Sequence, residues 1–145
     1  MEFILEEEFL KQPKEVQNVI NNSIKLNIGD RIYHKLSKKY YIYLGEYNEA
    51  FWNVFDLEDK CTSVICKDYF CRCLCEGRLR KFIEDKTGGK VEFYPDVYSG
   101  RRYYTIIIRE TGCGGDDPTF EPYADDVLQA YWKVAVRIAK ENINK

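Results

Sequence analysis

The spacing of apolar residues changes twice along the chain, near residues 25 and 76. Before residue 25 apolar side chains recur at helical spacing, as at Val16, Val19 and Ile20. Between residues 25 and 75 they alternate with a period of two, and after residue 76 both periods occur. This predicts an α+β chain in three segments: an N-terminal helical segment (1–24), a β segment (25–75) and a helix–strand–strand–helix sandwich (76–145).

The first segment is predicted to hold two short helices separated by Pro13. Proline is tolerated in the first turn of a helix and is damaging further inside one. The first helix is therefore expected to end near Lys11 and the second to begin near Pro13.

The second segment reads as short strands joined by turns. Runs rich in β-branched and aromatic residues alternate with short turns of Ser, Asn, Asp, Glu and Lys. The predicted strands span residues 31–36, 40–47, 51–57, 62–66 and 69–75. Five strands over so short a stretch are typical of a small antiparallel β-barrel, whose closure removes exposed sheet edges.

The third segment begins with a helix whose apolar stripe is Leu79, Phe82 and Ile83, and which Gly88 and Gly89 should end. Strands are predicted over 91–97 and 103–108, with the turn between them at 98–101. The unbroken Ile106–Ile108 run indicates burial on both faces. A final amphipathic helix is expected from Asp125 and Asp126 onward.

Two stretches resemble known families. The spacing of Gly29-Asp30-Arg31-Ile32, Tyr43-Leu44-Gly45 and Trp52-Asn53-Val54-Phe55-Asp56-Leu57 resembles that of Tudor-like and KOW-like small barrels. The stretch Gly77–Ile143, with Arg80-Lys81-Phe82-Ile83-Glu84 and the closing run Tyr123–Trp132, is similar to small phage ABA-sandwich proteins. The second resemblance implies a phage or prophage accessory protein, a group that includes antagonists of host immunity.

Charge and the N-terminal residues bear on the partners of the protein and on its compartment. The net charge is −2, and residues 25–75 carry eight Lys or Arg against seven Asp or Glu. A general nucleic-acid binder needs a basic surface, so nucleic acid is not expected as a partner. The chain opens with acidic residues where a secretory signal would be basic, and no apolar run suits a membrane span. A cytoplasmic protein is predicted, in the host cell cytoplasm if phage-encoded.

Cysteine is the first candidate for metal chemistry, with six residues at 61, 66, 71, 73, 75 and 113. On one strand Cys71, Cys73 and Cys75 would share a face, with Cys66 on a neighbouring strand. Thiolates gathered in this way suit zinc, but structural zinc sites favour Cys-x2-4-Cys knuckles, which this spacing lacks. Buried apolar cysteine is therefore favoured, no cofactor is expected, and a cysteine-ligated zinc protein stays an alternative.

Catalytic groups are sparse. His34 is the only histidine and shares its strand face with Ile32 and Leu36, and no third group can be named to orient it as a base. The glycine-rich stretch 111–118 lacks the Gly-Lys-Ser/Thr ending of a phosphate-binding loop and reads as a flexible connection. The chain is therefore predicted not to be an enzyme.

Aromatic residues are numerous, with 12 tyrosines and 8 phenylalanines, and alternation should turn about half of the strand rings outward. Tyrosine and arginine together suit a partner protein, or a nucleotide base and its phosphate. An equally good interpretation is that strands favour tyrosine, because its ring can pack against the core while its hydroxyl remains hydrated. The candidate ligand-binding residues are Trp52, Tyr98, Arg101, Arg102, Tyr104 and Arg109.

These patterns predict a non-catalytic, phage-derived binding protein that antagonises bacterial antiviral defence. It would act by sequestering a nucleotide immune signal or by blocking a host immune protein. The alternatives are a nucleic-acid-contacting regulatory protein and the zinc protein. A homo-oligomer is also expected, because outward aromatic rings can be buried in a symmetric interface.

Overall fold

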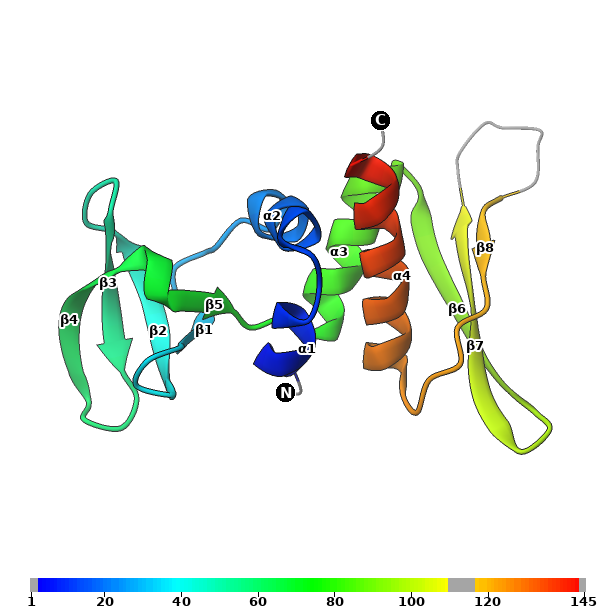
Figure 1. The fold of residues 1–145 in the computed structure, drawn as a ribbon, viewed down its shortest axis with the longest axis horizontal. Helices are drawn as coiled ribbons and strands as arrows, with labels where there is room; N and C mark the ends of the chain where they lie inside the picture. The colour runs from blue at the N-terminus through cyan, green and yellow to red at the C-terminus, as the bar shows by residue number, and fades with distance from the viewer. Residues whose placement is uncertain (1–2, 110–116, 144–145) are drawn as a thin grey trace. The chain divides into compact units, whose positions relative to one another are not determined.

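A computed structural model of the chain describes residues 3–109 and 117–143 (Figure 1). The described residues form helices and two antiparallel sheets, of five and three strands, which confirms the α+β class. Contacts divide the chain into unit 1, residues Met1–Ile24 with Leu74–Lys145, and unit 2, residues Lys25–Cys73. Most of the glycine-rich stretch at 111–118, with Cys113, lies outside the described residues.

Unit 2 contains the strands that alternation predicted. They are β1 (Arg31–His34), β2 (Lys39–Glu46), β3 (Phe51–Asp56), β4 (Cys61–Cys66) and β5 (Phe70–Arg72), with a 3-10 turn η1 (Lys67–Tyr69) before β5. The sheet order is β4-β3-β2-β1-β5 and neighbouring strands are antiparallel. One face of the sheet forms a core of Ile32, Tyr41, Tyr43, Trp52, Val54 and Phe70.

The predicted closed barrel is wrong. Within residues 25–73, all of which the structure describes, β4 and β5 are the two edges of an open five-stranded sheet and do not pair. Alternation reports which side chains face the core, but it does not report whether two edge strands meet. The last strand is also shorter than predicted, because β5 ends at Arg72 and residues 73–75 are not part of it.

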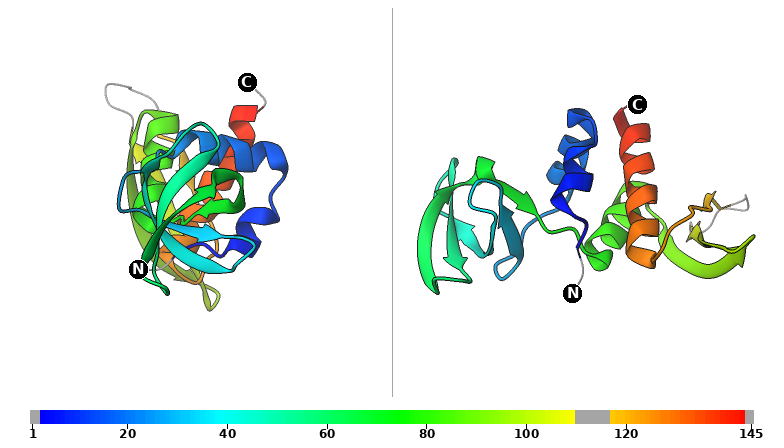
Figure 2. Two further views of the ribbon diagram at one scale, coloured as in Figure 1. Left: turned by 90° about the vertical axis from the view of Figure 1, so that its left-hand side faces the viewer. Right: turned by 60° about the horizontal axis from the view of Figure 1, so that its bottom comes forward.

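Unit 1 is a three-stranded sheet with helices packed on one face (Figures 1 and 2). Its elements are α1 (Glu6–Leu10), α2 (Lys14–Ser23), α3 (Glu76–Thr87), β6 (Lys90–Tyr98), β7 (Arg101–Arg109), β8 (Thr119–Phe120) and α4 (Val127–Ile143). The sheet order is β6-β7-β8, so the two-residue strand β8 adds an edge that the predicted helix–strand–strand–helix order lacks.

The N-terminal helices share the core of unit 1. The Ile4 N–H donates to the Leu74 carbonyl at 2.8 Å, and the Phe9 ring lies 6.3 Å from the Trp132 ring. Val16 and Ile20 of α2 are buried in the same cluster as the apolar stripe of α4. Residues 3–24 therefore pack with the C-terminal half of the chain rather than forming a core of their own.

Two glycines explain how α3 gives way to β6. Gly88 ends the helix with φ 76°, a conformation that favours glycine, and its N–H donates to the Glu84 carbonyl at 2.8 Å. A Cβ on Gly89 would lie 2.4 Å from Ile108 Cγ2, so the chain passes β7 too closely for any side chain. This close approach fixes where the helix meets the sheet.

The helices cover only one face of the β6–β7 hairpin. Ile106 and Ile108 are fully buried, whereas Ile107 between them is half-buried. The expected burial on both faces is therefore wrong, because α3 and α4 lie on the same side of the sheet (Figure 1). In the part of the chain that the structure describes, no helix combines the length and apolarity needed to cross a membrane.

Candidate functional site

Strand register sorts the candidate residues onto the two faces of the β6–β7 hairpin. Tyr98 pairs with Arg101 and Val97 pairs with Arg102. Residues level with Ile106 and Ile108, which include Arg102 and Tyr104, face the helices. The opposite side, here named the outer face, carries Lys90, Glu92, Tyr94, Asp96, Tyr98, Arg101, Tyr103, Thr105, Ile107 and Arg109.

The outer face presents tyrosine rings to solvent. Tyr94 is 51% exposed and Tyr98 is 65% exposed. Tyr123, which bridges to Tyr103 in an antiparallel arrangement, is 39% exposed. The Arg101 guanidinium lies 4.2 Å from the centre of the Tyr123 ring, a cation–π contact that holds both side chains against the sheet.

Carboxylates of the same face hold the tyrosine hydroxyls. Tyr94 Oη donates to Glu92 Oε2 at 3.0 Å, and Tyr103 Oη donates to Asp96 Oδ2 at 3.0 Å. The bond to Asp96 raises the pKa of Tyr103 above its ordinary value, and the bond from Tyr94 lowers the pKa of Glu92. The rings are thus restrained before any partner binds.

Arg109 lies at the other end of β7 and is paired within the sheet. Its Nε lies 3.2 Å from Glu92 Oε2, and its Nη1 lies 3.1 Å from Asp117 Oδ2. These two carboxylates raise the pKa of Arg109. Its guanidinium is therefore committed to contacts inside the sheet, whereas Arg101 stands beside the exposed rings.

Arg102 and Tyr104 line a shallow cleft on the helix-facing side of the hairpin. The cleft has a volume of about 470 Å³ and is also lined by Pro95, Asp96 and Val97. Arg102 Nη1 donates to the Asp125 carbonyl at 3.4 Å, and Tyr104 is buried. The structure therefore separates this pair from Tyr98 and Arg101.

Trp52 is buried in unit 2. Its ring stacks at 5.7 Å from Phe70 and meets the Tyr43 ring edge-on at 5.1 Å. Only 7% of the residue is exposed. Trp52 is thus part of the core of unit 2 and offers no free ring face to a ligand.

The cysteines do not form the cluster that the zinc alternative needs, and the favoured interpretation of buried cysteine is right only for Cys71 among those described. Because β5 ends at Arg72, Cys71 is in the strand but Cys73 and Cys75 follow it. Cys66 is on β4, and three strands separate β4 from β5 in the sheet order. Among the described residues no group of three or more His, Cys, Asp or Glu side chains is arranged to hold a metal ion.

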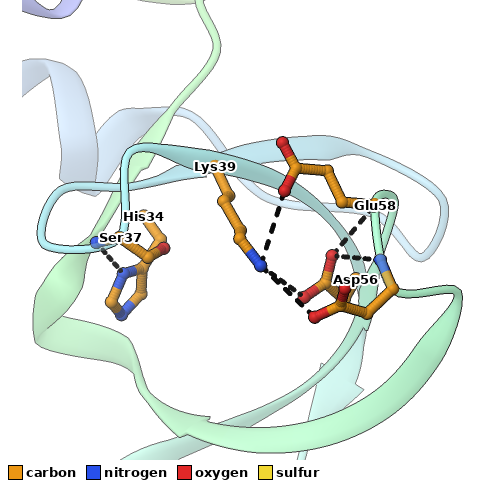
Figure 3. Close-up of polar contacts among 6 residues, drawn as sticks. His34, Ser37, Lys39, Asp56 and Glu58 are labelled. Carbon is orange, nitrogen blue, oxygen red and sulfur yellow. Dashed lines mark hydrogen bonds and ion pairs between the residues drawn. The ribbon is translucent and has the colours of Figure 1, made fainter.

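The polar side chains of unit 2 stabilise turns (Figure 3). His34 Nδ1 accepts the Ser37 N–H at 3.0 Å, and burial lowers the pKa of the imidazole. Asp56 Oδ1 accepts the N–H groups of Glu58 and Asp59, and its Oδ2 lies 3.5 Å from Lys39 Nζ. The Asp59 N–H is the main cause that lowers the pKa of Asp56.

No family model, curated protein or solved structure matches this chain. The site must therefore be judged from its own geometry. Of the candidate residues, the structure brings Tyr98 and Arg101 together on an open aromatic face. Sequence reasoning left Tyr94, Tyr103 and Tyr123 out of the site, although the alternation of Tyr94, Asp96 and Tyr98 would have placed Tyr94 on the same strand face as Tyr98.

Proposed function

We propose that this chain is a non-catalytic binding protein whose outer face covers a surface of a partner protein. Following the resemblance to phage accessory proteins, the partner is a protein of bacterial antiviral defence and the chain is its phage-derived antagonist. The observation that carries the binding role is the group of exposed rings on one face: Tyr94, Tyr98 and Tyr123.

Composition of the outer face supports a protein partner. Tyrosine and arginine are enriched where protein interfaces bind most strongly, because they combine a large apolar surface with hydrogen-bonding groups. Here Arg101 lies against Tyr123, and Tyr98 is its strand neighbour. A sheet face that carries several exposed rings suits another surface better than it suits a small molecule.

Restraint of the rings supports the same role. Binding costs free energy for each side chain that must be ordered. The hydroxyls of Tyr94 and Tyr103 are already bonded to Glu92 and Asp96. Much of that ordering is complete in the free protein, so more of the contact energy would appear as affinity.

Blocking a protein is favoured over sequestering a nucleotide at this site. A nucleotide pocket would need the arginines and rings to converge on one cavity. The register instead divides Arg101 and Arg102 between opposite faces, and Trp52 is buried in unit 2. The regulator and zinc alternatives receive no comparable support from the described residues.

The test is phage plating on bacterial strains that each carry one defence system. Expression of the chain should restore plating in at least one strain. The double variant Tyr94→Ala/Tyr98→Ala should lose that effect, because it removes the two most exposed rings of the outer face. Tyr47→Ala is the matched control, since Tyr47 is a 63% exposed tyrosine of unit 2.

Two results would count against the proposal. If plating is not restored in any defended strain, the antagonist role fails. If the double variant restores plating as well as the natural chain does, the outer face is not the binding surface.

A further inference from the structure

A second concave site lies between α1 and α4 of unit 1, away from the hairpin. It is a groove of about 370 Å³, near the lower end of the roughly 300–1,000 Å³ typical of small-molecule sites. Its lining residues are Glu8, Lys11, Gln12, Gln129, Trp132, Lys133, Val136 and Lys140.

The lining of this groove is cationic. Three lysines and one glutamate give it a formal charge of +2, in a chain whose net charge is −2. Glu8 Oε1 accepts a hydrogen bond from Gln129 Nε2 at 3.2 Å, so the carboxylate is turned toward the amide. The excess positive charge is therefore local and is not a property of the whole molecule.

The three lysines of the groove differ in their polar contacts. Lys133 Nζ donates to the Tyr123 carbonyl. Lys11 and Lys140 are exposed and have no acidic side chain at ion-pair distance among the described residues. Lys11 follows the last turn of α1 and Lys140 is in the last turn of α4, so two uncommitted ammonium groups border the groove.

The remaining lining residues of the groove supply apolar surface and amide groups. Val136 provides half-buried apolar surface, and Trp132, which is packed against Phe9 and only 4% exposed, lies beneath it as the floor of the groove. Gln12 and Gln129 add amide groups that can both donate and accept. Such a lining suits a molecule with a compact anionic group and an apolar or ring-containing part.

We propose that the α1–α4 groove binds a phosphate-bearing small molecule of about the size of a nucleoside monophosphate. A phosphate monoester carries about −1.5 to −2 charges at neutral pH, which matches the charge of the lining. Lys11 and Lys140 would hold the phosphate, while Val136 and the amides of Gln12 and Gln129 would contact the remainder. This site is separate from the outer face and does not rest on the protein-binding role.

The test uses AMP, adenosine and inorganic phosphate as probes of the full chain in NMR titrations. AMP should shift the indole N–H resonance of Trp132 saturably, and inorganic phosphate should compete with it. Adenosine, which lacks the anion, should bind far more weakly. Added salt should weaken AMP binding, since the contacts are between exposed charges.

Charge-removing variants locate the site. Lys11→Gln and Lys140→Gln should each weaken AMP binding about tenfold, the effect of losing one charge-assisted hydrogen bond. Lys81→Gln is the control, because Lys81 is an exposed lysine of α3 whose Nζ lies 3.4 Å from Asp85 Oδ2. Thermal unfolding of each variant checks that the fold is unchanged.

The proposal is overturned if neither AMP nor inorganic phosphate binds saturably, if adenosine binds as well as AMP, or if both glutamine variants bind as the natural chain does. The double variant Tyr94→Ala/Tyr98→Ala should bind AMP normally. That result separates failure of this site from failure of the outer face.

Discussion

Unit 1 and unit 2 both place tyrosines on antiparallel strands, but the rings meet different surroundings. In unit 2, Tyr41 and Tyr43 are 6% and 8% exposed and pack among Trp52 and Phe70. In unit 1, Tyr94 and Tyr98 are 51% and 65% exposed. Tyrosine on an antiparallel strand can therefore belong to a core or to a surface, and each unit contains both cases: Tyr40 of β2 is 43% exposed, and Tyr104 of β7 is buried.

The difference lies in what covers each face. In unit 2 the rings come from several strands onto one face and pack against one another, with Leu26 and Ile65 beside them. In unit 1 the helices fill the side of the sheet where Tyr104, Ile106 and Ile108 lie, and Tyr94, Tyr98 and Tyr103 alternate to the other side. A ring count cannot distinguish the two cases, because it contains no information on the covering layer.

The largest loss of stability is expected when an aromatic ring is removed from the core of unit 2. Trp52→Ala should lower the free energy of unfolding by about 3–5 kcal/mol, since it deletes a buried ring that contacts Tyr43 and Phe70. Chemical denaturation followed by circular dichroism measures the change. A loss below about 1 kcal/mol, the range of a surface site, would contradict burial of this ring.

The next largest loss of stability is expected at a close backbone contact in unit 1. Gly89→Ala should cost about 1–3 kcal/mol, because the new methyl group would collide with Ile108 and with the Arg109 carbonyl. The same denaturation experiment applies. Gly77→Ala is the control, since a Cβ at Gly77 meets no atom within 4 Å, and it should not destabilise the protein.

A smaller, pH-dependent effect is expected at His34. Burial lowers its folded-state pKa, so the folded protein holds the neutral ring and its stability is greatest above pH 6.5. Stability should fall as the pH drops below that value, because protonated Nδ1 cannot accept the Ser37 N–H. Unfolding midpoints at pH 7.5 and 5.5 measure this.

The control for that prediction is unusually clean, because His34 is the only histidine of the chain. Carboxylates titrate below this window and thiols above it. His34→Gln should therefore remove most of the change between the two pH values. An equal change in the variant would assign the effect to another group.

The smallest effect is expected on the outer face. Tyr98→Ala should change the free energy of unfolding by no more than about 0.5 kcal/mol, because its ring is largely in solvent. Tyr43→Ala is the matched substitution in unit 2 and should cost several times more. Similar losses in both variants would contradict the contrast between the two units.

Much of the fold was predictable from local pattern. Each helix and each longer strand lies where spacing and turn residues predicted it, because one buried face imposes its period on the sequence. Closure of the sheet in unit 2 was not predictable, since the pairing of edge strands is a long-range property. Nor was β8, which has only two residues and pairs with β7 from beyond residues 110–116.

The candidate site was predictable in part. The turn at 98–101 correctly joined β6 and β7 and brought Tyr98 beside Arg101. Adjacent arginines cannot share a strand face, so the Arg101–Arg102 pair was bound to divide once both lay on β7. The α1–α4 groove was not predictable, because Lys11 and Lys140 are 129 positions apart in sequence and line one groove only once the helices pack together.

The contrast between the units can be measured directly by tyrosine nitration of the native protein, followed by mass spectrometry of its peptides. Tyr94 and Tyr98 should react quickly, whereas Tyr41, Tyr43 and Tyr131 should react only when the protein unfolds. Fast nitration of Tyr41 and Tyr43 together with protection of Tyr94 and Tyr98 would contradict the account, because the core of unit 2 and the outer face of unit 1 would then be exchanged.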